Sequence, residues 1–280
     1  HLEHPIRVNQ FSTDFIWRRY SNTEDVDSKN GNGIEIIADK ITLDTPEIVL
    51  DSQFLLDIPT NANAFLSLAG DLKLRDASKA FYYYPSEYMG EALIDYLRGA
   101  LKQGYADNGQ LLWFGEFANY PYRNGDGIFQ TKLNVVDAVF AFDPQWPSVT
   151  DLELELLFKN DDLFMSSRKG NLDQVAISRV DLQLPRLGDV KALGIQAQFK
   201  TTGAQAKSLI DSSPLPEVTN ALNSLQVSGD LNGKIDIVIP FTDDDQVVVK
   251  GDIDLVNDRM YLPALDLTLT DVNGSFTFDD

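Results

Sequence analysis

The chain has 280 residues, a formal net charge of −20 and no cysteine. Such an acidic surface repels phosphate backbones, because nucleic-acid affinity comes largely from Lys and Arg side chains and the counterions they displace, so we expect no nucleic-acid partner. The absence of cysteine excludes disulfides, thiolate nucleophiles and zinc–thiolate sites, and it agrees with an oxidising compartment such as a periplasm.

The N-terminal part is predicted to be irregular. Residues 1–30 pass through the polar, Asn- and Gly-rich stretch SNTEDVDSKNGNG, whose composition is typical of a loop. The two histidines of the chain, His1 and His4, lie at its very start. Histidine catalysis and histidine-ligated metal sites are therefore not expected in the folded region.

Strands follow, because in the next runs every second residue is hydrophobic. A period of two places these side chains on one face of a β-strand and the polar ones on the other face. We expect strands near 33–44, 47–58 and 64–75. Residues 1–85 are therefore predicted to be a strand-rich segment behind an irregular start.

A helix is predicted to interrupt the strands at 86–104. Ser86 is a suitable N-cap, and Gly104 is a suitable C-terminal stop. Between them an apolar stripe recurs at helical spacing. The stripe consists of Met89, Leu93, Tyr96, Leu97 and Leu101.

Strands resume over 105–202, which we expect to be an antiparallel β segment. The clearest alternation occurs here, where Leu152, Leu154 and Leu156 alternate with glutamates. An antiparallel sheet built in this way has one apolar face and one polar face. The predicted strands lie near 109–119, 127–142, 149–159, 162–168, 171–184 and 192–200.

A second helical insertion is predicted over 203–225, as two short helices broken at Pro214 and Pro216. Residues 226–280 then contain about four more strands in an antiparallel arrangement. The last residues still have a strand pattern, and folded proteins seldom end on an open sheet edge. We therefore expect the sheet to continue beyond this fragment in a longer polypeptide.

Two features allow two interpretations each. Glycine and aspartate followed by an aliphatic residue recur at 69–74, 228–233 and 250–255, which indicates either bends in a twisted sheet, the interpretation we favour, or a repeat of strands. The aromatic clusters at 81–85 and 111–122 indicate either packing within the protein, again favoured, or contact with sugars or a lipid interface.

The residue patterns of common enzymes are absent from the sequence. It has no G-x-S-x-G turn. The segment GDLNGKI at 229–235 has one residue too few between its glycines, and an isoleucine where a phosphate loop needs Ser or Thr. We therefore expect no enzymatic activity, no cofactor and no metal site.

Several blocks together resemble the central region of the YhdP family, which is part of the AsmA-like group. The match runs in order over roughly residues 86–280, and its more specific parts are the helix followed by WFGEF and the DPQWP block. The blocks are EALIDYLRGALKQG, LLWFGEFANYPYRNGDGIFQ, FAFDPQWPSVTDLELELLFKND, SSPLPEVTNAL and VSGDLNGKIDIVIPF.

The resemblance implies a very large envelope protein of Gram-negative bacteria, held in the inner membrane and crossing the periplasm as an elongated β-groove. It implies a role in outer-membrane biogenesis, the transfer of phospholipid between inner and outer membrane along the hydrophobic groove, without catalytic residues. This fragment would then be a periplasmic portion that contacts phospholipid acyl chains and reaches the two membranes through parts outside it.

The predicted fold is mainly β: a long, curved antiparallel sheet that forms an elongated groove, with a few short helices acting as flaps or plugs. The 86–104 helix, through its apolar stripe, and the 203–225 insertion would cover the groove where its lining is otherwise exposed. The expected lining residues are Leu152, Leu154, Leu156, Ile235, Ile237, Ile239, Ile253, Leu255, Leu265, Leu267 and Leu269.

Periodicity alone leaves a second fold open. In a closed β-sandwich or barrel, the scaffold module of an envelope protein with no ligand, the same hydrophobes would pack against each other. Substituting Asp or Arg at Leu154 or Ile237 distinguishes the two, because the new charge would unfold a closed core but would mainly block lipid passage in an open groove.

Overall fold

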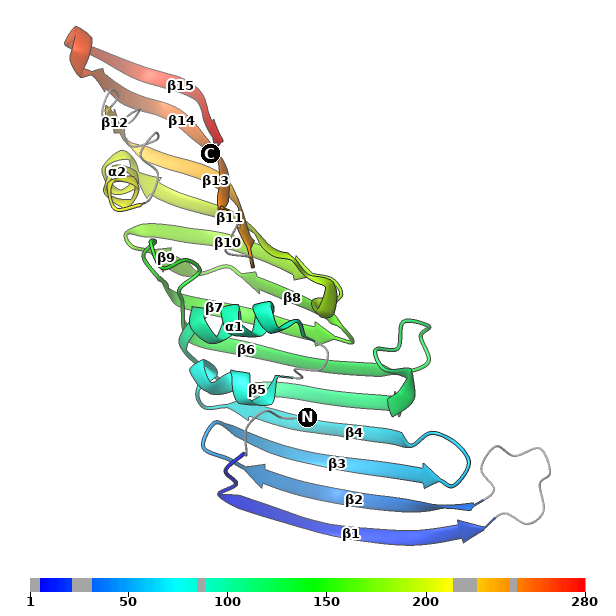
Figure 1. Ribbon diagram of the computed structural model, residues 1–280. Helices are drawn as coiled ribbons and strands as arrows, with labels where there is room; N and C mark the ends of the chain where they lie inside the picture. Colours follow the sequence, from blue (N-terminus) through cyan, green and yellow to red (C-terminus); the bar gives the residue numbers. More distant parts are fainter. Residues whose placement is uncertain (1–5, 22–31, 85–88, 214–225, 242–245, 280) are drawn as a thin grey trace.

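The computed structural model describes residues 6–21, 32–84, 89–213, 226–241 and 246–279. In these residues fifteen strands form one sheet, and strands that follow each other in the chain are neighbours along most of its length (Figure 1). All described strand pairs are antiparallel, β1 pairs with β2 at one end, and β15 pairs with β14 at the other. The sheet is open, so the predicted fold class is confirmed and the closed alternative is wrong for the described part of the chain.

The first half of the sheet consists of β1 (Gln10–Ser21), β2 (Asn32–Asp44), β3 (Ile48–Pro59), β4 (Phe65–Leu74), β5 (Leu101–Glu116), β6 (Ile128–Phe140) and β7 (Val149–Lys159). The second half consists of β8 (Asp162–Ser167), β9 (Gly170–Leu172), β10 (Val175–Leu184), β11 (Ala192–Thr202), β12 (Gln226–Ser228), β13 (Asp230–Pro240), β14 (Val248–Leu262) and β15 (Leu267–Asp279). Two α-helices, α1 (Glu91–Ala100) and α2 (Gly203–Asp211), and the 3₁₀ helices η1 (Ala77–Tyr83), η2 (Phe117–Asn119), η3 (Leu187–Asp189) and η4 (Pro263–Leu265) complete the described elements.

Most predicted strands match observed ones to within a few residues at their ends, but the prediction of an irregular start is wrong for β1. This edge strand has exposed hydrophobic side chains on both faces: Ile16 is 70% exposed and its neighbour Trp17 is 64% exposed. Apolar residues on both faces hide the period of two, so the strand was not recognisable by alternation. The polar stretch that follows, residues 22–31, lies outside the described residues.

The helix predicted at 86–104 is shorter in the structure, because α1 spans Glu91–Ala100 and β5 begins at the next residue. Gly90 is the N-cap, and the expected cap, Ser86, lies outside the described residues. Gly104 is not a helix stop. It lies in β5 with φ of 138°, and a Cβ there would lie 2.8 Å from Val135 Cγ1, so glycine is needed for the close approach of β6.

The second predicted helical insertion begins where expected, with α2 at residue 203. The proposed break at Pro214 and Pro216 lies outside the described residues. The recurring Gly-Asp motif occupies unlike positions, since Gly70 lies inside β4 whereas Gly229 precedes β13 with φ of 136°. Gly251 lies inside β14, as Gly70 lies inside β4, so the three occurrences do not all share one position in the sheet.

Both aromatic clusters pack within the protein, as the favoured interpretation predicts. The Trp113 indole donates a hydrogen bond to the Tyr122 hydroxyl at 2.7 Å and stacks on the ring of Tyr120 at 5.6 Å between centroids. In the other cluster, the Arg98 guanidinium lies 5.0 Å from the centre of the Phe81 ring.

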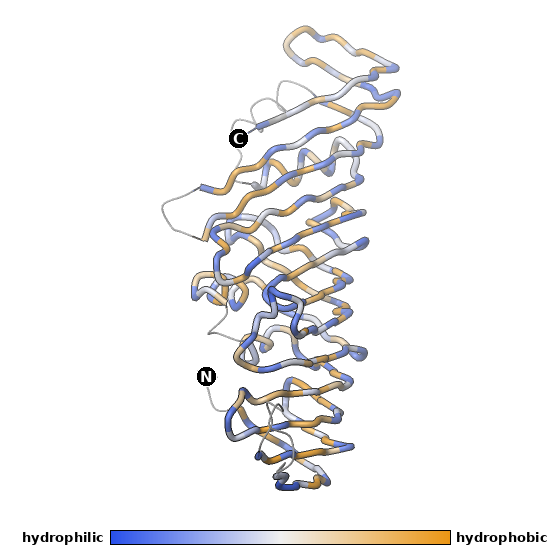
Figure 2. Tube along the Cα trace, turned by 90° about the vertical axis from the view of Figure 1, so that its right-hand side faces the viewer, coloured by the Kyte–Doolittle hydropathy of each residue, from blue (hydrophilic) through white to orange (hydrophobic). Residues whose placement is uncertain are grey.

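One face of the sheet is apolar along its length, since directly opposed hydrophobic residues form rows across successive strands. Hydrophobic and hydrophilic residues alternate along the strands in Figure 2. Register shifts in several strand pairs mark bulges, which bend and twist a sheet. Two rows on the apolar face are Phe54, Leu68, Trp113 and Phe129 across β3 to β6, and Leu133, Leu156, Met165 and Leu182 across β6 to β10.

Helix α1 lies over the apolar face near β6 (Figure 1). Its inward residues Leu93 and Ile94 are 1% and 5% exposed, and they belong to the main hydrophobic cluster. The Tyr96 hydroxyl donates a hydrogen bond to the Phe142 carbonyl oxygen at 3.1 Å, and the Tyr96 ring lies 5.4 Å from the ring of Phe241, which follows β13. The helix therefore touches two distant parts of the sheet.

A network of polar side chains, which we call the polar clamp, joins Arg75 and Tyr83 to the turn between β2 and β3. Arg75, which follows β4, binds both carboxylate oxygens of Asp44 at 2.8 Å and the Thr45 carbonyl oxygen at 2.5 Å. The hydroxyl groups of Thr45 and Tyr83 lie 2.7 Å apart, and Tyr83 also donates to Glu47 at 2.9 Å. These bonds connect the turn between β2 and β3 with the segment that leads into α1.

Acid is expected to open this clamp. The hydrogen bond from Arg75 holds the pKa of Asp44 at about 2, below its usual 3.8. A carboxyl whose pKa is lowered on folding stabilises the fold above its unfolded pKa, and this contribution is lost as the pH falls toward the folded pKa. We therefore expect the stability difference between the wild type and Asp44→Asn to shrink between about pH 4 and pH 2. Unfolding of both proteins, followed by circular dichroism at a series of acid pH values, measures this stability difference. A difference that stays constant with pH would contradict the prediction.

An apolar pocket as the candidate functional site

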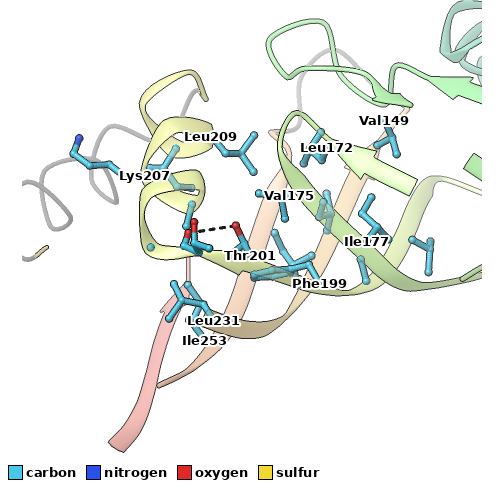
Figure 3. A pocket seen from close by; sticks show the side chains of 18 of the residues that line it. Val149, Leu172, Val175, Ile177, Phe199, Thr201, Lys207, Leu209, Leu231 and Ile253 are labelled. Carbon is cyan, nitrogen blue, oxygen red and sulfur yellow. Dashed lines mark hydrogen bonds between the residues drawn. The ribbon is translucent and has the colours of Figure 1, made fainter. Parts of the chain in front are cut away.

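A pocket of about 800 Å³ lies on the apolar face between the later strands and α2 (Figure 3). This volume is within the range of small-molecule sites, roughly 300 to 1,000 Å³. Inward side chains from β7 to β15 form its walls, because the period of two turns one side of each strand toward it. The apolar walls include Val149, Leu152, Leu154, Met165, Val175, Ile177, Leu182, Ile195, Phe199, Leu231, Ile235, Ile237, Ile253, Leu255 and Phe276.

Sheet register explains why residues far apart in the sequence meet here. Ile177 on β10 opposes Phe199 on β11, and Ile253 on β14 opposes Phe276 on β15. Gly233 on β13 opposes both Phe199 and Ile253 and so completes the row. A single line of cross-strand neighbours thus crosses the floor of the pocket.

Helix α2 covers one side of the pocket. A capping box fixes its start, because the Thr202 hydroxyl accepts from the Gln205 N–H at 3.3 Å while the Gln205 side chain accepts from the Thr202 N–H at 3.0 Å. Gly203 is required at the first position, since a Cβ there would overlap the Val227 carbonyl oxygen. Leu209, 8% exposed, points from the helix toward the wall of the pocket (Figure 3).

The lining of the pocket carries almost no charge. Among the described residues that line it, Lys207 is the one charged side chain. Its ammonium lies on the side of α2 away from the pocket (Figure 3) and forms an ion pair with Asp211 at 2.6 Å. Polar groups are confined to hydroxyls and amides such as Thr201 and Gln226. The pocket therefore suits an uncharged, hydrocarbon ligand.

Three aromatic residues close the end of the pocket nearest α1. Phe140 ends β6, and Phe142 and Trp146 lie in the connection to β7. Phe142 is 5% exposed and Trp146 is 8% exposed, with 5.7 Å between their ring centroids. Tyr96 of α1 contacts Phe140 from the other side, at 6.3 Å between centroids.

The structure places about half of the predicted lining residues around the pocket. Leu156 is partly buried beside the hydrophobic cluster, and Ile239 is buried within it. Leu265 lies in η4 rather than in a strand and is 69% exposed, while Leu267 and Leu269 are 42% and 39% exposed on β15. The predicted residues that line the pocket are Leu152, Leu154, Ile235, Ile237, Ile253 and Leu255.

The residues proposed for the first flap helix do not line the pocket. Met89 and Leu93 are buried, Tyr96 and Leu97 are partly buried against the cluster, and Leu101 belongs to β5. The helical wall comes instead from α2, which lies in the predicted 203–225 insertion, for which no individual lining residues were predicted. The inward residues of α2, Leu209 and Ile210, appear in the sequence only as two adjacent apolar residues, which is a weak signal for a pocket wall.

Sequence comparison finds one protein family and one relative that are similar to this chain. All of it, residues 1–280, matches the family model described as YhdP protein. It is 32% identical over 250 residues to the Escherichia coli (strain K12) protein named "Intermembrane phospholipid transporter YhdP", a match that covers 89% of this chain and 20% of that protein. The chain thus spans about a fifth of the length of this relative. No solved structure gives a significant match.

Proposed function

We propose, since this chain belongs to the YhdP family, that its apolar face is a segment of a conduit for phospholipid between the inner and outer membrane. The observation that carries this proposal is the apolar pocket of about 800 Å³, whose described walls direct no charged group into it. An acyl chain lies in this pocket, and the charged head group stays in water.

The hydrophobic effect supplies the affinity. Burying each methylene contributes about 0.8 kcal/mol, so a phospholipid acyl chain gains on the order of 10 kcal/mol before the cost of ordering it. Burial of this size replaces the hydrocarbon surroundings that the acyl chain loses when it leaves a membrane.

The same walls allow movement. Backbone N–H and C=O groups are paired within the sheet, so the face presents hydrocarbon and few directional bonds. A ligand held mainly by non-directional contacts moves along the face without breaking specific hydrogen bonds.

We place this segment in the periplasm, as one portion of a longer protein that is anchored in the inner membrane and reaches both membranes through other parts. The cysteine-free composition agrees with that location. None of the helices in the described part of the chain has the length and apolar character needed to cross a bilayer. The relative named as a transporter supports a role in carriage rather than catalysis.

Lipid analysis tests the proposal. The chain, purified from cells without detergent and extracted with organic solvent, is expected to yield phospholipid in near-stoichiometric amount by mass spectrometry. After removal of this lipid, the protein is expected to take up phospholipid again from vesicles. Protein that neither carries phospholipid nor takes it up would contradict the proposed function.

A further inference from the structure

The two ends of the pocket differ in burial. At the end nearest α1, Phe142 and Trp146 are almost fully buried, with 5% and 8% exposure. At the opposite end the lining residues lie on β14 and β15, where Leu255 and Phe276 are partly exposed and Ser275 is exposed. An acyl chain in the pocket therefore meets buried aromatic rings at the end nearest α1.

Helix α1 supports these rings from behind. The Tyr96 hydroxyl donates to the backbone carbonyl of Phe142 at 3.1 Å, and its ring packs on Phe140. Burial raises the pKa of Tyr96, so the hydroxyl stays protonated and remains a donor throughout the neutral range. Because Phe241 contacts the same ring at 5.4 Å, α1 is held by contacts to the ends of both β6 and β13.

The apolar face does not end at this point. Beyond α1 it continues over β1 to β4, where Phe15 opposes Ala38 and Trp17 opposes Ile36 on the same side of the sheet. Phe15 is 57% exposed and Trp17 is 64% exposed, so none of the described residues covers these two side chains. The aromatic end of the pocket and α1 thus lie between two stretches of apolar surface.

We propose that Phe140, Phe142 and Trp146 form a stop that sets the longest acyl chain the pocket accepts, with Tyr96 as the residue that positions it. This inference rests on the proposed function and adds a specificity to it. An acyl chain that occupies the pocket ends at these rings while α1 is in place, and the apolar face continues beyond them over β1 to β4.

A chain-length series tests the stop. Binding of lysophospholipids with saturated acyl chains of increasing length is measured by isothermal titration calorimetry on the delipidated 280-residue chain. Each added methylene is expected to tighten binding about fourfold until the chain reaches the stop, after which the affinity no longer rises. Trp146→Ala is expected to move this break point to longer chains, because removing the indole extends the cavity.

Matched variants separate the stop from general effects on folding. Phe114→Ala truncates an aromatic side chain that is 50% exposed on the opposite face of the sheet, outside the pocket, and is expected to leave the break point unchanged. Tyr96→Ala is expected to move the break point as Trp146→Ala does, and Tyr96→Phe is expected to restore most of it through the retained ring. If Trp146→Ala does not fold, Phe142→Leu reports the same shift with a smaller truncation.

The outcomes distinguish the stop from the conduit. Affinity that rises without a break in the wild type, or an unchanged break point in folded Trp146→Ala or Phe142→Leu, would overturn the stop while leaving acyl-chain binding intact. Absence of binding at every chain length would contradict the proposed function, and the stop with it.

Discussion

Ile253→Asp is expected to weaken acyl-chain binding strongly while the protein stays folded. Ile253 lines the pocket from β14 and is only partly buried, so water reaches a carboxylate there when the pocket is empty. A bound acyl chain would remove that water without offering a hydrogen bond, which costs several kcal/mol for a charged group. Because every 1.4 kcal/mol is a factor of ten, we expect affinity to fall by about 100-fold or more.

The choice of Ile253 follows from burial. Leu154 and Ile237, the positions that the sequence favours for this test, are 6% and 7% exposed. Asp at either site would destabilise the protein even in an open sheet, so unfolding there would not identify a closed core. The intermediate exposure of Ile253 separates loss of binding from loss of fold.

Displacement of a fluorescent fatty acid measures the effect, with circular dichroism to follow folding. Ile16→Asp is the matched control, since Ile16 is 70% exposed on β1 and lies outside the pocket. This control is expected to bind like the wild type. Retention of wild-type affinity by Ile253→Asp would show that acyl chains do not occupy this pocket.

The strands were accessible from sequence because their signal is local. Alternation along 149–159 needs only neighbouring residues, and β7 spans Val149–Lys159 as predicted. The same rule fails inside that strand, where Val149 and Leu152 both line the pocket although three positions separate them. Asp151 has φ of 53° and shifts the alternation, and no periodic pattern shows where such a bulge lies.

The pocket depends on how distant strands and helices pack against each other. No short sequence pattern shows this packing. Both helical insertions are amphipathic, yet only α2 contributes pocket walls, because strand order decides which surface each helix covers. Leu265 shows the reverse error. It continues an alternating pattern, but it lies in η4, the short 3₁₀ helix that joins β14 to β15, and its side chain is exposed.

Leu93→Ala is expected to cause a large loss of stability. Leu93 is 1% exposed at the centre of α1 and belongs to the hydrophobic cluster that joins the helix to the pocket walls. Removing a fully buried leucine side chain costs about 2 to 5 kcal/mol, through lost transfer energy and the cavity left behind. Urea denaturation is expected to show a loss of this size, with Glu91→Ala, an exposed change in the same helix, costing less than about 1 kcal/mol.

Hydrogen exchange shows where that stability is lost. If α1 is part of the cooperative core, Leu93→Ala lowers protection in α1 and in the neighbouring strands β5 and β6 together. If α1 opens separately, protection falls in the helix alone, and the stop at the end of the pocket becomes conditional on helix docking. A stability equal to that of the wild type would contradict the burial of Leu93, and with it the packing of α1 that holds Tyr96 against Phe140 and Phe142.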